Sequence, residues 1–101
     1  MRVKVTQGGS KAVLMLSGRF DFNSHRDFRG AYEPLVDEAD VREVTLDLGG
    51  VEYLDSSALG MLLMLRDKAG AANTSILLAN VRGGVKQVLD IANFGKLFQI
   101  V

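Results

Sequence analysis

The fold is decided by Val44-Thr45-Leu46-Asp47-Leu48-Gly49-Gly50-Val51-Glu52-Tyr53-Leu54-Asp55-Ser56-Ser57-Ala58-Leu59-Gly60, a stretch that passes from the pattern of a strand to that of a helix. Residues 43–48 alternate between polar and apolar side chains, which is typical of a strand with one buried face. After two glycines, residues 51–54 lead into a long helix that we expect from about Ser56 to Gly70. The stretch therefore predicts a strand-to-helix unit with polar residues at its turn.

A hairpin is predicted upstream of this unit. Residues 2–6 and 11–17 alternate in polarity or run apolar, and the four residues from Gln7 to Ser10 have the chemistry of a turn. We expect Ser17-Gly18 to end the second strand. The hairpin supplies two antiparallel strands to the fold.

The period of the apolar residues then changes to that of a helix, which we predict over residues 24–38. Ser24 and Asp27 resemble a capping box, in which each side chain accepts a hydrogen bond from the backbone of the other. Pro34 lies inside this helix and removes one backbone donor, so we expect a kink there and not an end.

Shorter elements complete the chain. We predict a strand at residues 75–79, a helix whose apolar stripe runs from Val85 to Ala92, a helix stop at Gly95 and a last strand at residues 97–101. Strands that alternate with helices indicate parallel pairing through right-handed crossovers. No repeat or linker interrupts this pattern.

These elements predict a single α/β domain over residues 1–101. Its simplest architecture is a mixed β-sheet of about five strands with helices packed mainly on one face. The other face would be partly solvated, as polar residues such as Lys4, Thr45 and Asp47 permit.

The composition narrows the classes of function. Twelve Lys and Arg balance twelve Asp and Glu, so no overall field favours nucleic acid or an acidic membrane surface. The chain has no cysteine, which excludes disulfides, thiol catalysis and thiolate metal sites and suits a reducing compartment. No apolar stretch approaches the roughly 20 residues of a membrane span. We expect a cytoplasmic protein that needs no cofactor or metal.

The helix after Leu54 has two distinct faces at 100° per residue. The face expected to pack on the sheet holds apolar residues at helical spacing, namely Ala58, Met61, Leu62, Leu65 and Ala69. The outer stripe holds Ser56, Gly60, Leu63 and Asp67, with Met64 beside it. Glycine permits close approach of a partner's backbone and methionine adapts its shape, so this outer stripe suits a protein contact.

Two interpretations of Asp55, Ser56 and Ser57 remain open at this point. Such residues are ordinary N-cap chemistry at the start of a helix. Three polar residues in a row nevertheless exceed what one helix end requires. Ser57 lies off the outer stripe and is the better candidate for the cap, whereas Ser56 lies on it. In the same way, Leu63 and Met64 could belong to a contact surface or be buried under other helices.

The stretch from Val44 to Gly60 resembles the signature of the STAS domain family, and specifically of the bacterial anti-sigma-factor antagonists. In that family a strand ends in an acidic-serine-serine turn, followed by a small residue, leucine and glycine. The likeness extends over nearly the whole chain. Its further segments are Leu16 to Asp21, Val85 to Leu89 and Leu97 to Ile100.

This resemblance implies a switch that works through its partners. The unmodified protein would bind an anti-sigma factor or a related serine kinase, which would phosphorylate Ser56, and a separate serine phosphatase would reverse the modification. The partner-binding residues would be Asp21, Asp55, Ser57, Ala58, Gly60, Leu63 and Met64. Ala58 and Arg19 depart from the family pattern, in which glycine and an acidic residue are common at these positions.

Two other functions are possible on the sequence. The chain could be a scaffold subunit of a larger lipid-transport or stress assembly, in which the serine carries no signal. It could also be a small hydrolase with Ser56 as nucleophile, but His25 is the sole histidine and the Gly-x-Ser-x-Gly turn of such enzymes is absent. We therefore expect a binding protein and not an enzyme.

Overall fold

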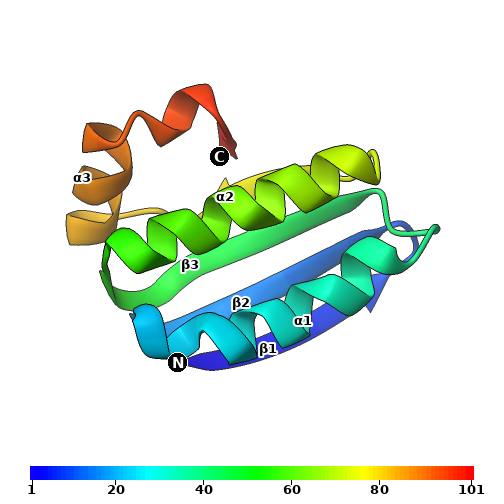
Figure 1. Ribbon diagram of the computed structural model, residues 1–101, viewed down its shortest axis with the longest axis horizontal. Coiled ribbons are helices and arrows are strands. Elements are labelled where there is room, and N and C mark those ends of the chain that lie inside the picture. The colour runs from blue at the N-terminus through cyan, green and yellow to red at the C-terminus, as the bar shows by residue number, and fades with distance from the viewer.

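The strand of the decisive stretch, β3 (Glu43–Leu54), lies at the centre of a five-stranded sheet in the computed structural model, which describes all residues from Met1 to Val101 (Figure 1). The other strands are β1 (Arg2–Gly8), β2 (Lys11–Phe20), β4 (Ser75–Ala79) and β5 (Gln99–Ile100). The helices are α1 (His25–Asp37), α2 (Ser56–Ala71) and α3 (Gly83–Ile91). Two single turns of 3-10 helix, η1 (Phe22–Ser24) and η2 (Phe94–Lys96), complete the elements.

The strands follow one another in the sheet in their order along the chain. β1 is antiparallel to β2, and β2, β3, β4 and β5 are parallel. Because each crossover moves in the same direction across the sheet, the right-handed rule places α1, α2 and α3 on the same face. Figure 1 shows α1 and α2 side by side over the strands. The predicted α/β class, the mixed five-stranded sheet and the one-sided helical layer are confirmed.

The core lies between the sheet and these helices. Alternate residues of β2 and β3 point into it and are excluded from water, as the period of a strand requires. They are Ala12, Leu14, Leu16, Val44, Leu46 and Leu48. All five residues predicted for the inner face of the second helix are buried against them, so the predicted phase of α2 is confirmed.

The opposite face of the sheet carries no helix. Lys4, Met15 and Asp47 lie side by side on it, because Lys4 pairs with Met15 and Met15 pairs with Asp47 across the strands. Lys4 and Met15 are exposed and Asp47 is half-buried. The predicted polar alternation on this face is confirmed.

The predicted strand ends at Ser17-Gly18 and Gly49-Gly50 are wrong. β2 continues to Phe20 and β3 to Leu54, and their pairing shifts register twice on the way. Gly50 is opposite Ser17, where a Cβ would lie only 2.8 Å from the Cβ of Ser17. Gly49 and Gly50 therefore belong to the bulged strand β3 and not to a turn, and Gly50 permits its close contact with β2.

The predicted capping box of the first helix is also wrong. The Ser24 side chain makes no capping bond to α1. Asp21 and Ser24 form the box instead, one turn earlier, around η1. Pro34 lies within α1, which continues to Asp37, so the helix does not end at the proline.

The C-terminal segment differs from its prediction in two places. α3 ends at Ile91, and the left-handed conformation that follows is taken by Asn93, with φ of 59°, and not by Gly95. η2 then occupies the chain as far as Lys96, so the last strand is only Gln99–Ile100 and not 97–101. Phe94 and Phe98 stack in the core at 5.5 Å between ring centroids and anchor this segment.

Candidate partner-binding site

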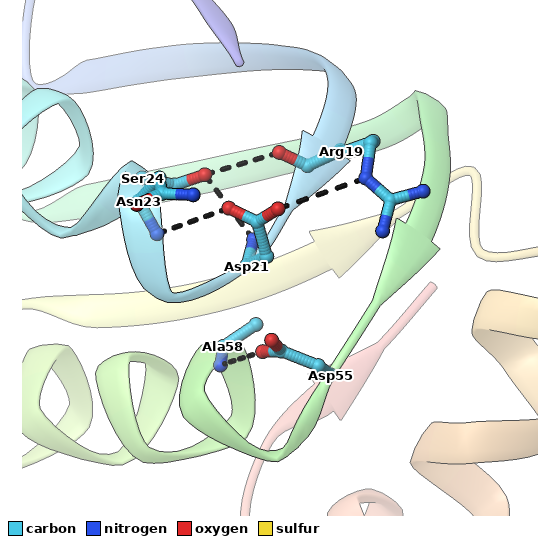
Figure 2. Close-up of polar contacts among 6 residues, drawn as sticks. All are labelled: Arg19, Asp21, Asn23, Ser24, Asp55 and Ala58. Carbon is cyan, nitrogen blue, oxygen red and sulfur yellow. Dashed lines mark hydrogen bonds and ion pairs between the residues drawn. The ribbon is translucent and has the colours of Figure 1, made fainter.

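The site forms where the carboxyl ends of β2 and β3 meet. Phe20 is paired with Leu54, and the backbone N–H of Asp55 donates to the carbonyl of Phe20 at 3.3 Å. Asp21 and Asp55 each follow directly after their strand, and Figure 2 shows them at this shared end of the sheet. Parallel pairing thus brings together two acidic residues that are far apart in the sequence.

Asp55 is the N-cap of α2. Its Oδ1 accepts a hydrogen bond from the backbone N–H of Ala58 at 2.9 Å, which satisfies one of the free donors at the helix start (Figure 2). The prediction that Ser57 makes this cap is wrong. The reason is that β3 extends to Leu54, which leaves Asp55 as the last extended residue and makes both serines helical.

Ser56 and Ser57 begin α2 in different surroundings. Ser56 is exposed and Ser57 is half-buried. Neither side chain takes part in any of the side-chain hydrogen bonds of the structure. Ser56 therefore presents a free hydroxyl to solvent on the first turn of the helix, beside the N–H groups that the helix leaves unpaired.

The remaining predicted contact residues of α2 are not equally accessible. Gly60 and Met64 are exposed, whereas Leu63 is half-buried and packs against the core. Ala58 is fully buried under the helix. A partner contact through the Ala58 side chain is therefore excluded, because the small residue faces the sheet and not the surface.

Asp21 has a structural role at the end of β2. Its Oδ1 accepts from the N–H of Asn23 at 3.0 Å, and its own N–H donates to the Ser24 hydroxyl at 3.2 Å. Ser24 is buried and donates in turn to the carbonyl of Arg19 at 3.0 Å. This network, drawn in Figure 2, fixes η1 to the end of β2.

Three exposed residues at the same end of the sheet as Ser56 were not named as contact candidates in the sequence analysis. The guanidinium of Arg19 lies over the ring of Tyr53, 4.1 Å from its centroid, and its Nε is 3.6 Å from the carboxylate of Asp21. Phe22, on η1, is 74% exposed. An aromatic residue directly after Asp21, outside any apolar period, was the signal available in the sequence.

The far half of α2 is held to α1 by an ion pair. Lys68 Nζ lies 2.9 Å from Asp37, and this hydrogen bond raises the pKa of the Lys68 ammonium. The Asp37 side chain is largely exposed, so the pair contributes little to the free energy of unfolding. The first turn of α2, by contrast, is positioned by the sheet and by Asp55.

A model of the family described as Mlab, STAS domain matches residues 3–101, which is nearly the whole chain. The chain belongs to the STAS domain family. A STAS-domain containing protein of Pseudomonas aeruginosa (strain UCBPP-PA14) is 49% identical over 92 residues, covering 91% of this STAS domain and 89% of that protein. The family resemblance seen in the sequence is confirmed.

Solved structures share the fold of this STAS domain. An anti-sigma factor antagonist from Mycobacterium paratuberculosis superimposes with a TM-score of 0.85 at 19% identity, over 98% of this chain and 83% of that one. The Bacillus cell fate determinant SpoIIAA in its phosphorylated form gives a TM-score of 0.76 at 16% identity, over 99% of this chain and 91% of that one. None of the helices in the STAS domain is both long and apolar enough to cross a membrane.

Proposed function

We propose that this STAS domain is an anti-sigma-factor antagonist regulated by phosphorylation of Ser56. The unmodified domain binds an anti-sigma factor of the serine-kinase type in the cytoplasm, that kinase phosphorylates Ser56, and a serine phosphatase restores the binding form. The domain itself catalyses no reaction. One observation carries the proposal: Ser56 has an exposed, unbonded hydroxyl at the start of α2, while its neighbour Asp55 caps the helix.

The separate roles of Ser56, which has the free hydroxyl, and Asp55, which caps the helix, suit a reversible modification. A kinase needs an accessible hydroxyl whose modification does not unfold its substrate. Because the cap belongs to Asp55, a phosphate on Ser56 removes no hydrogen bond of the fold. The unpaired amides of the first turn and the positive end of the helix dipole also favour an anion there.

The same phosphate would oppose a protein contact. It adds about −1.5 to −2 charge units to a chain whose formal net charge is zero. That charge would stand on the outer stripe of α2 beside Gly60 and in front of Met64, where an apolar or acidic partner surface cannot accommodate it. We therefore expect phosphorylation to abolish binding and leave the fold intact.

The test uses the serine kinases of the anti-sigma type encoded by the organism of this protein, each purified. Each is incubated with the wild-type domain and ATP, and the modified residue is mapped by mass spectrometry. Ser56→Ala removes the expected site, and Ser57→Ala is the matched control on the adjacent residue. Modification of Ser57 alone, or of neither serine, would contradict the proposal.

Binding by the same kinase is then measured for the wild type, Ser56→Ala and Ser56→Asp. We expect Ser56→Ala to bind as the wild type and Ser56→Asp to bind at least about tenfold more weakly, a difference of about 1.4 kcal/mol. The circular dichroism melting curve of each variant checks that the fold is unchanged. Equal affinity of all three proteins would reject gating by charge.

A second candidate is the scaffold subunit of a larger assembly, which the helix-free face of the sheet favours. Met15 is exposed on this face, two residues from the partly buried Val13 on the same strand. A role of this kind predicts that Met15→Glu abolishes assembly and that Ser56→Asp does not. The proposed antagonist role predicts the reverse for these two variants.

A further inference from the structure

We infer that Arg19, Phe22 and Tyr53 form an anchor at the same end of the sheet as Ser56, and that this anchor selects a partner whose apolar cleft is bordered by carboxylates. The inference rests on the proposed function and names the chemistry of the partner for that same site. Arginine and aromatic residues are the types most enriched among the residues that dominate binding energy at protein interfaces. These three residues are the exposed members of both types at the shared end of β2 and β3.

Arg19 and Tyr53 face each other because of the irregular pairing of their strands. Lys11 pairs with Glu43, and the same offset continued along β2 would bring Val51 opposite Arg19. The two register shifts move the pairing by two residues, so Arg19 is paired with Tyr53. The bulges thus create the stack of guanidinium on ring, which fixes two long side chains before any partner arrives.

Phe22 extends the same surface toward α2. It lies on η1, which contacts α2, and the capping box of Asp21 and Ser24 holds that turn rigid. An aromatic ring that is 74% exposed gains little from the fold of its own chain. Tyr53, 42% exposed, precedes Ser56 by three residues in the chain. Both rings are therefore exposed at the end of the sheet where α2 begins.

The charge that lies over the Tyr53 ring is positive, although acidic residues, including the exposed Glu52, are close in the chain. Arg19 exposes 63% of its side chain, whereas Asp21, its ion-pair partner, exposes 22%. Asp55 is turned to its cap on Ala58, and Glu52 lines a separate hollow with Arg82. Arg19 is thus the more accessible member of its ion pair, and its complement on a partner is a carboxylate.

The inference is tested with the kinase identified by the phosphorylation of Ser56. Its affinity is measured for the wild type, Phe22→Ala, Tyr53→Ala, Tyr53→Phe and Arg19→Gln. We expect Phe22→Ala, Tyr53→Ala and Arg19→Gln each to weaken binding by about tenfold or more, and Tyr53→Phe to retain it, because the ring and not the hydroxyl carries the stack. Ile91→Ala is the matched control, since Ile91 is 83% exposed at the end of α3.

The salt dependence of the affinity shows how much of the binding comes from the charge of Arg19. Affinity of the wild type should fall more steeply between low and high ionic strength than that of Arg19→Gln, because the lost pair is screened by salt. Equal slopes would overturn the assignment of an acidic partner surface. If Phe22→Ala and Tyr53→Ala bind the kinase with wild-type affinity while Ser56→Asp does not bind it, the anchor is wrong and the proposed function stands. Failure of the wild type to bind any kinase would overturn the proposed function and the anchor with it.

Discussion

The backbone N–H of Asp55 donates to the carbonyl of Phe20 across the ends of two parallel strands. This bond aligns the turn that precedes α2 with the turn that precedes α1. It therefore brings Asp21 and η1 next to the first turn of α2, which carries Ser56. Two loops from separate parts of the chain thus act as one surface, and their backbone geometry is set by the sheet beneath them.

Gly60→Ala should stabilise the fold and weaken partner binding. A Cβ at this position has no heavy atom within 4 Å, so alanine fits the free domain and should raise the free energy of unfolding by up to about 1 kcal/mol through helix propensity. The added methyl lies on the outer stripe beside Ser56 and should weaken the partner contact. Urea denaturation and kinase binding measure the two effects.

Gly70→Ala provides the control for this substitution. Gly70 is also in α2 and equally free of neighbours, but it lies about four turns from Ser56. We expect the same direction of stabilisation and unchanged affinity for the kinase. If both alanine variants bind as the wild type, Gly60 is not part of the contact.

Asp55→Ala should lower the free energy of unfolding by about 1 kcal/mol, because the N–H of Ala58 loses its acceptor at the start of α2. Asp55→Asn keeps a side-chain oxygen that can accept this bond, so most of the stability should remain. Thermal and urea unfolding compare the two variants. A loss as large in Asp55→Asn as in Asp55→Ala would mean that the charge, and not the cap, is what the fold requires.

Gly50→Ala should destabilise the domain by about 1–3 kcal/mol, the range of overpacked interiors. Its Cβ would meet the Cβ of Ser17 at 2.8 Å and the carbonyl of Leu16 at 3.1 Å, so one strand must move. Gly8→Ala is the control in a strand, since a Cβ there meets nothing within 4 Å. Equal stability of these two variants would show that the bulge adapts without cost.

Tyr32→Phe should change the alkaline limit of stability. Burial raises the pKa of the Tyr32 phenol above its ordinary value of 10.0, with a further contribution from Glu33. The folded state therefore holds this proton more tightly than the unfolded state, and stability falls as the pH rises above about 10. The phenylalanine variant lacks this titration, so its free energy of unfolding should decline less between pH 9 and pH 11. Parallel decline in both proteins would contradict the assignment.

The elements of the fold could be predicted because their apolar periods are clear. The inner face of α2 is the best example, since every residue expected to be buried is buried. The course of β2 and β3 could not be predicted in the same way. Gly18, Gly49 and Gly50 have the composition of turns, and only the neighbouring strand shows that they bridge a bulge.

The place of Ser56 at the start of the helix and its exposure agree with the sequence prediction, because Ser56 occurs in a continuous motif and on a definite helical phase. Whether Asp55 or Ser57 is the N-cap of α2 depends on the residue at which β3 ends, and the bulges determine that residue. The contact of Arg19 with Tyr53 likewise depends on a register shifted by two residues. Interactions that depend on strand register leave no period in the sequence.

The free hydroxyl of Ser56 also has a consequence for how this module can be altered. The N–H of the first helical position has no partner within the helix, and the cap that holds α2 belongs to Asp55. The residue that we propose to carry the signal can therefore be exchanged without redesigning the scaffold. Replacing the recognition sequence around Ser56, with Asp55 kept, offers an engineer a way to place the same domain under the control of a different modifying enzyme.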